Sequence, residues 1–119
     1  MTYSDAWVDT IDDPEFRALI DSQSGTGSRR ADKLFLLPHA PRPGDYLINV
    51  VREWAAANGL CVEHNGHLEI QVRVTRQQLA RFLEETFGPE RDSAAAPLQR
   101  HVRERLRDDC TYLVVADEF

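Results

Sequence analysis

Residues 61–74, CVEHNGHLEIQVRV, constrain the fold more than any other stretch, because they are typical of two strands joined by a tight turn. Asn65-Gly66 favours a two-residue type I′ turn, in which both central residues need positive φ. This turn predicts that His64 opposes His67. Side chains alternate between the faces of a strand, so apolar and polar residues then separate. We predict Cys61, Leu68, Ile70, Val72 and Val74 on the buried face, and His64, His67, Glu69, Gln71 and Arg73 on the other.

Helix signals flank this hairpin on both sides. Asp45 is predicted to cap a helix over residues 45–59, with Gly59 in the left-handed position that ends it. Thr75 and Gln78 form a capping box for the next helix, which Gly88-Pro89 is expected to stop. A further helix is predicted over residues 97–109, with Leu98, Val102 and Leu106 facing inward.

Three segments divide the chain. Residues 1–24 are predicted to be a helical segment, in which Asp13 caps a helix that starts at Pro14. The spacing of Trp7, Val8 and Ile11 favours a second short helix before it. Residues 25–32 are a polar linker that lacks the glycine and lysine pattern of a phosphate loop, and residues 33–119 form the α/β domain.

The order of elements predicts an α+β fold. Residues 33–38, KLFLLP, and 111–119 are apolar on both faces, which is typical of strands in the middle of a sheet. We therefore expect a ferredoxin-like split β-α-β sandwich: a four-stranded antiparallel sheet with helices on one face, an extra helix before the last strand and the N-terminal helical extension. The second sheet face would be apolar where the first and last strands meet, and either residues 1–24 or a second copy would cover it.

Charge and composition narrow the possible partners. The net charge of −6 is concentrated at the ends, with −5 in residues 1–24 and −4 in residues 108–119. Such acidic ends disfavour nucleic acid and membranes as partners, and the sheet offers few aromatic residues for stacking on bases. The acidic start has no signal-peptide pattern, and two cysteines are too few for a disulfide scaffold, so we expect a cytoplasmic bacterial protein.

Four sets of residues are candidate sites. His64, His67 and Glu69 have the ligand types of a zinc site, although a hairpin tip is usually convex and wet, and exposed turn residues are the simpler interpretation. Arg100, Arg103 and Arg107 share one helix face and are candidates for binding a partner, although a solvated face is the simpler interpretation. Cys61 and Cys110 are expected to be core residues. His39 follows a predicted central strand and is a bare catalytic candidate.

These features predict binding and not catalysis, with no catalytic residues and no cofactor. We expect either an inhibitor or immunity-type partner of a basic protein, or a ligand-binding module that associates with itself. The alternative is a small enzyme that uses His39 or the face with His64, His67 and Glu69.

Overall fold

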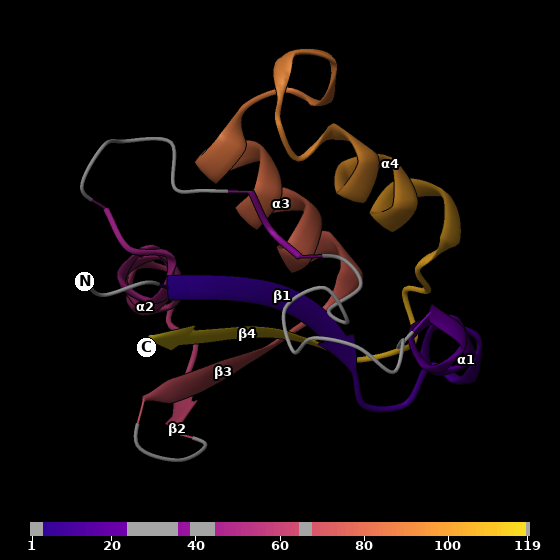
Figure 1. Cartoon of the computed structure of the whole chain (residues 1–119), viewed down its shortest axis with the longest axis horizontal. Helices are drawn as coiled ribbons and strands as arrows, with labels where there is room; N and C mark the ends of the chain where they lie inside the picture. The colour runs from indigo at the N-terminus through magenta and orange to yellow at the C-terminus, as the bar shows by residue number, and fades with distance from the viewer. Residues whose placement is uncertain (1–3, 24–35, 39–44, 65–67, 119) are drawn as a thin grey trace.

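The computed structural model describes residues 4–23, 36–38, 45–64 and 68–118, without the side chains of residues 21–23. These residues form a small α+β domain with a four-stranded antiparallel sheet and four α-helices (Figure 1). None of the helices within these ranges has the length and apolar character that a transmembrane span requires.

The sheet has the strand order β1-β4-β3-β2. Its strands are β1 (Ser4–Thr10), β2 (Val62–His64), β3 (Glu69–Val74) and β4 (Tyr112–Glu118). β1 pairs with β4 from Ser4 opposite Glu118 to Thr10 opposite Tyr112. The two acidic ends of the chain, which are far apart in sequence, therefore lie side by side.

The predicted short helix before Pro14 is wrong, because these residues form β1. Ala6 and Val8 lie in the main core, while Trp7 is buried on the other face of the strand. A run this short and apolar on both sides cannot be assigned to helix or strand by periodicity alone. The rest of the N-terminal prediction is confirmed, since α1 (Pro14–Gln23) is a helix.

The segment predicted as the first central strand, residues 33–38, is described only from Leu36 onward. Leu36 forms an isolated antiparallel bridge with Trp7, and the Leu37 amide donates to the Ala6 carbonyl at 2.7 Å. These residues lie at the outer edge of β1 and not between two strands. The place that sequence reasoning gave to residues 33–38, beside the last strand, belongs to β1.

The ferredoxin-like connectivity is not confirmed. A split β-α-β repeat joins parallel strands through its helices. Here every neighbouring pair in the order β1-β4-β3-β2 is antiparallel, so β1 runs opposite to β2. β3 and β4, which flank the second helical connection, are themselves antiparallel neighbours. The coarser prediction of an α+β domain with a four-stranded antiparallel sheet is confirmed.

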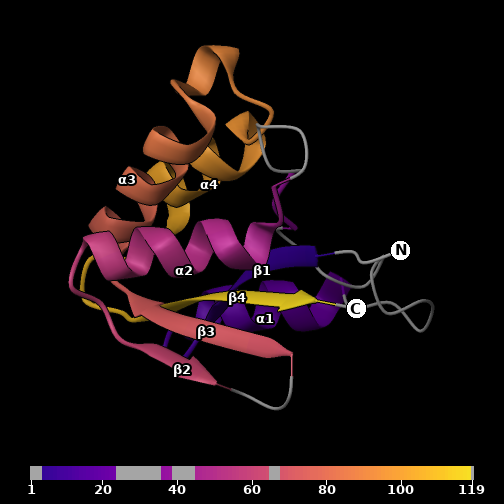
Figure 2. The ribbon, with the colours of Figure 1, turned by 90° about the vertical axis from the view of Figure 1, so that its left-hand side faces the viewer.

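Three helices lie on one side of the sheet. α2 (Leu47–Ala57) contacts β1, β3 and β4, and α3 (Arg76–Phe87) contacts β3 and β4. α4 (Ala96–Arg105), which follows the short 3-10 helix η1 (Glu90–Asp92), packs mainly on α3. α1 is not part of this layer: it lies beyond the end of β1 (Figures 1 and 2).

The main core fills the space between the sheet and these helices. Its largest fully buried side chains are Tyr112, Phe82, Ile70, Leu79, Leu83, Val8, Val51, Val72, Val74, Val102 and Val114.

Most of the predicted helix ends are confirmed. The Asp13 side chain accepts a hydrogen bond from the Phe16 amide at 3.1 Å, and Thr75 and Gln78 form the expected capping box. Gly59, at φ 69°, follows the last residues of α2 in the left-handed region that favours glycine. Asp45 is not the cap of α2: the cap position is Tyr46, which makes no side-chain capping bond.

The predicted register of the hairpin is wrong. His64 lies opposite Ile70, and Val62 lies opposite Val72, so residues 65–69 separate the first paired residues instead of the two that a type I′ turn would leave. The observed connection is longer than the predicted turn by an odd number of residues. Because side chains alternate along a strand, every side chain of β2 therefore lies on the face opposite to the predicted one. Cys61, predicted to be buried, is accordingly exposed. Leu68, also predicted to be buried, lies just before β3 and is exposed as well.

Candidate functional site

The predicted zinc residues do not meet in the described part of the hairpin. His64 lies opposite Ile70 and shares its face, whereas Glu69 precedes Ile70 and lies on the other face. His67 and His39 lie outside the described residues. Within those residues, no group of three His, Cys, Asp or Glu side chains is placed to hold a metal ion.

The three arginines predicted to bind a partner make ion pairs within the chain. Arg100 lies 3.3 Å from a Glu90 carboxylate oxygen, and Arg103 binds the second oxygen of the same carboxylate. Arg107 lies 3.3 Å from Asp109. One acidic side chain thus partly neutralises the first two arginines, and a role for the three in binding stays a prediction.

A buried hydrogen-bonded cluster joins the start of α1 to the start of β4. The side chain of Asp13, which is only 2% exposed, accepts from the Tyr112 hydroxyl at 2.6 Å and from the Phe16 amide at 3.1 Å. The Tyr112 oxygen in turn accepts from the Arg107 amide at 2.8 Å. Burial raises the pKa of Tyr112, so the phenol keeps the proton that it donates to Asp13.

A second contact fixes the same junction from its exposed side. The Thr111 amide donates to the Asp12 carboxylate at 2.7 Å, and the Cys110 sulfur lies 3.7 Å from the Asp12 carbonyl oxygen. Burial raises the pKa of the Cys110 thiol, and Asp109 raises it further. Cys110 is therefore a buried, protonated side chain, as predicted, and not an activated nucleophile.

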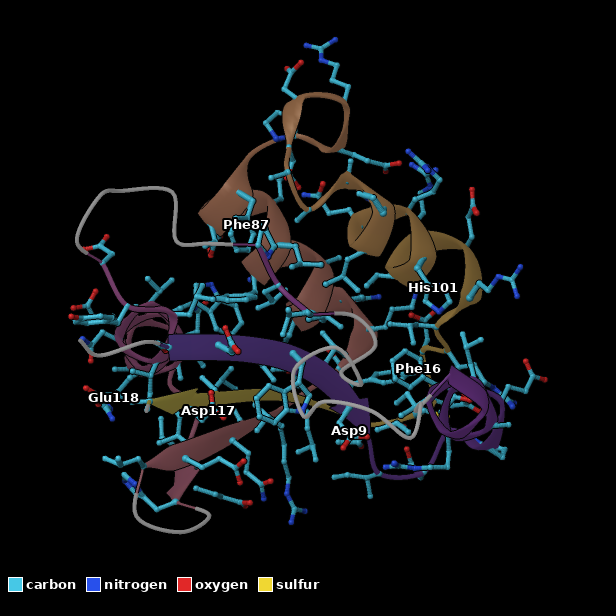
Figure 3. All side chains as sticks on the ribbon, in the orientation of Figure 1. Asp9, Phe16, Phe87, His101, Asp117 and Glu118 are labelled. Carbon is cyan, nitrogen blue, oxygen red and sulfur yellow. The ribbon has the colours of Figure 1, made fainter. Side chains whose placement is uncertain are left out.

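A cavity of about 370 Å³ lies between the α1 region and α4. His101 of α4 and Phe16 of α1 lie toward one another across the gap between these helices (Figure 3), with ring centroids 5.9 Å apart in an edge-to-face arrangement. The cavity is lined by Asp13, Glu15, Phe16, Ala18 and Leu19 on one side and by His101 and Arg105 on the other.

The imidazole of His101 is the titratable group most affected by this setting. Burial lowers its pKa, and the nearby Arg105 guanidinium lowers it further, against the smaller opposing effects of Asp13 and Glu104. His101 is therefore neutral at pH 7, when one ring nitrogen donates a hydrogen bond and the other accepts one.

Two opposite charges border the cavity. Glu15 lies in the first turn of α1, and Arg105 is the last residue of α4. Within the described residues, neither side chain makes a hydrogen bond or an ion pair. Both side chains are exposed, so each remains available to a bound molecule.

The sheet carries a second polar feature on the face turned away from α2. Asp117 of β4 lies directly opposite Asp5 of β1 on one side and Glu69 of β3 on the other. Three carboxylates therefore form one row across three strands.

Sequence reasoning did not find the cavity, because its two walls come from helices that are far apart in the chain. A local signal was present in α4: His101 and Arg105 are four residues apart and border the stripe of Leu98 and Val102. Comparison of the chain with protein families, with curated proteins and with solved structures gave no match.

Proposed function

We propose that this protein is a non-catalytic binding protein that holds a small ligand in the cavity between α1 and α4. The observation that carries the proposal is the convergence of His101, Arg105 and Glu15 on a hollow with an apolar wall. Ligand sites are commonly hollows of about 300–1,000 Å³ with apolar linings and a few polar groups that fix orientation. A neutral histidine with a shifted pKa in such a hollow is a further sign of a functional site.

The chemistry of the lining supports binding over catalysis. Among the described residues that line the cavity, none carries a hydroxyl or a thiol that could act as a nucleophile. The buried carboxylate of Asp13 already accepts hydrogen bonds from Tyr112 and Phe16. Both cysteines are free, which fits the cytoplasmic, reducing compartment that we propose for the protein.

A fragment screen followed by NMR would test the site. We expect a subset of small, charged aromatic fragments to shift the amide signals of residues 13–19 and 101–105. An Ala18→Trp variant should abolish these shifts, because Ala18 is an exposed residue of the cavity wall and the indole would fill the hollow. Ala80→Trp, an equally exposed position in the middle of α3, is the matched control and should leave them unchanged.

Two results would contradict the proposal. Fragments that bind elsewhere and never shift residues 13–19 or 101–105 would remove the cavity as a site. Shifts that persist unchanged in the folded Ala18→Trp protein would do the same.

A second candidate function rests on the row of Asp5, Asp117 and Glu69. The three acidic side chains lie on one face of the sheet, and a basic protein would be complementary to them in charge. Such a complex should weaken steeply with salt, because exposed charges are screened over about 10 Å at 0.1 M ionic strength. Pull-down from a native lysate at low and high salt tests it: a basic protein should be captured only at low salt, and Asp117→Asn should reduce its capture.

A further inference from the structure

We infer that the ligand of this cavity is a zwitterion with an apolar side chain, such as a free apolar α-amino acid. The inference rests on the proposed function and adds the chemical class of the ligand. Its basis is the arrangement of the lining around a single hollow: the cation Arg105, the exposed carboxylate of Glu15 in front of the buried carboxylate of Asp13, a neutral imidazole and an apolar wall.

The carboxylate of the ligand would be held at the α4 side. Arg105 offers a planar guanidinium that matches a carboxylate in two hydrogen bonds, and no side chain in the described structure takes up those donors. His101, four residues earlier on the same helix, lines the same side of the cavity with a neutral imidazole, so it adds no second positive charge beside Arg105. A dianionic ligand fits less well, because Asp13 and Glu15 line the opposite wall.

The ammonium group of the ligand would lie toward α1. Glu15 supplies a carboxylate that makes no ion pair within the described residues. The buried Asp13 adds a negative field behind it, although its oxygens are already occupied by Tyr112 and Phe16. A neutral or purely anionic ligand would leave Glu15 without a partner and would desolvate it without compensation.

The apolar part of the ligand would lie between these two ends. Phe16, Ala18 and Leu19 supply the apolar wall, and Phe16 is held in place by edge contacts with His101 and Tyr112. The volume of about 370 Å³ is near the lower limit for ligand pockets, which favours one small molecule over a peptide.

Three matched probes separate the contributions of the two charges. L-Phenylalanine carries both charges, phenylacetate lacks the ammonium group, and phenethylamine lacks the carboxylate. We expect L-phenylalanine to shift the signals of Phe16, Leu19 and His101, and to bind about tenfold more tightly than either analogue, because each analogue loses a hydrogen bond to a charged group. Equal affinities for all three probes would overturn the zwitterion and leave the cavity as a site.

Two variants assign each charge to its residue. Arg105→Gln should weaken L-phenylalanine about tenfold and leave phenethylamine unaffected, whereas Glu15→Gln should weaken L-phenylalanine and leave phenylacetate unaffected. Arg91→Gln, an exposed arginine of η1 outside the cavity, is the control and should change nothing.

The results separate the two proposals. If L-phenylalanine binds equally well to all three variants, or shifts none of the cavity residues, the zwitterion inference is wrong. If the fragment screen also leaves those residues unshifted, the proposed function fails with it.

Discussion

The helices α1 and α3 both begin with a side-chain N-cap, which is buried at α1 and exposed at α3. In both, a side chain at the cap position accepts a hydrogen bond from an amide of the first turn, at 3.1 Å for Asp13 and also at 3.1 Å for Thr75. The surroundings differ: Asp13 is buried and also accepts from Tyr112, while Thr75 is exposed and has only its capping-box partner, Gln78.

This difference shows that a cap has more than one structural role. At α3 the capping box satisfies amides that water would otherwise solvate, so its removal affects one helix end. At α1 the cap also joins the helix to β4 through Tyr112, and it belongs to the wall of the cavity. Removal of the Asp13 side chain would leave buried polar groups without partners and would shift the wall of the cavity.

Asp13→Ala is the strongest test of the comparison. It removes the cap of α1 and the acceptor of the Tyr112 hydroxyl, so we expect it to lower the free energy of unfolding by about 3–4 kcal/mol. Urea denaturation measures this change. Asp92→Ala, an exposed position in η1, should stay within about 0.5 kcal/mol. If Asp13→Ala lowers the free energy of unfolding no more than the loss of an exposed cap does, burial does not increase the contribution of this cap to stability.

The caps also show how far the sequence predicts this structure. Asp13, Thr75, Gln78 and Gly59 were all predicted correctly, because each signal depends on residues within one turn of helix. Residues 4–10 were not, because a run of seven residues whose only apolar members are Ala6, Trp7 and Val8 suits either a short helix or a strand. Only the pairing with β4 decides between them, and that pairing is not local.

The candidate site could not be predicted from the sequence for the same reason: its residues come together only through contacts that are not local. The hairpin residues His64, His67 and Glu69 attracted attention because they are neighbours in the chain, but a change of register by an odd number of residues places His64 and Glu69 on opposite faces. His101 and Phe16 are neighbours only in the folded protein, where α1 lies beside the end of α4.

Tyr112→Phe sharpens the comparison by removing only the link between the cap and β4. Asp13 keeps its bond from Phe16 but loses that of the hydroxyl, which leaves a buried carboxylate oxygen without a partner and costs about 1–3 kcal/mol. A pH effect should accompany it. Because burial raises the pKa of Tyr112 in the folded state, the unfolded phenol loses its proton first, and stability should fall above about pH 10.

The measurement for this variant is urea denaturation at neutral and alkaline pH. The alkaline loss of stability should be smaller in Tyr112→Phe than in the unmodified protein. If both lose stability equally above about pH 10, the buried hydroxyl does not connect the cap to β4 in the way described.

Thr75→Ala tests the exposed side of the comparison. It removes one capping bond at the surface, so we expect a loss of about 1 kcal/mol, well below that of Asp13→Ala. Arg81→Ala, an exposed position in the middle of α3, is the control and should stay within about 0.5 kcal/mol. Thermal unfolding followed by circular dichroism is sufficient. A Thr75→Ala loss equal to that of Asp13→Ala would remove the distinction between the two helix starts.

His101 gives the smallest expected effect, and it too belongs to the buried helix start through its contact with Phe16. Burial and Arg105 lower its pKa below the ordinary value of 6.5. The unfolded chain therefore binds a proton more readily than the folded one, and stability falls as the pH drops below 6.5. His101→Gln should lose less stability than the unmodified protein between about pH 7.5 and about pH 5.5, measured by urea denaturation. An acid sensitivity of His101→Gln equal to that of the unmodified protein would show that the effect does not arise beside α1.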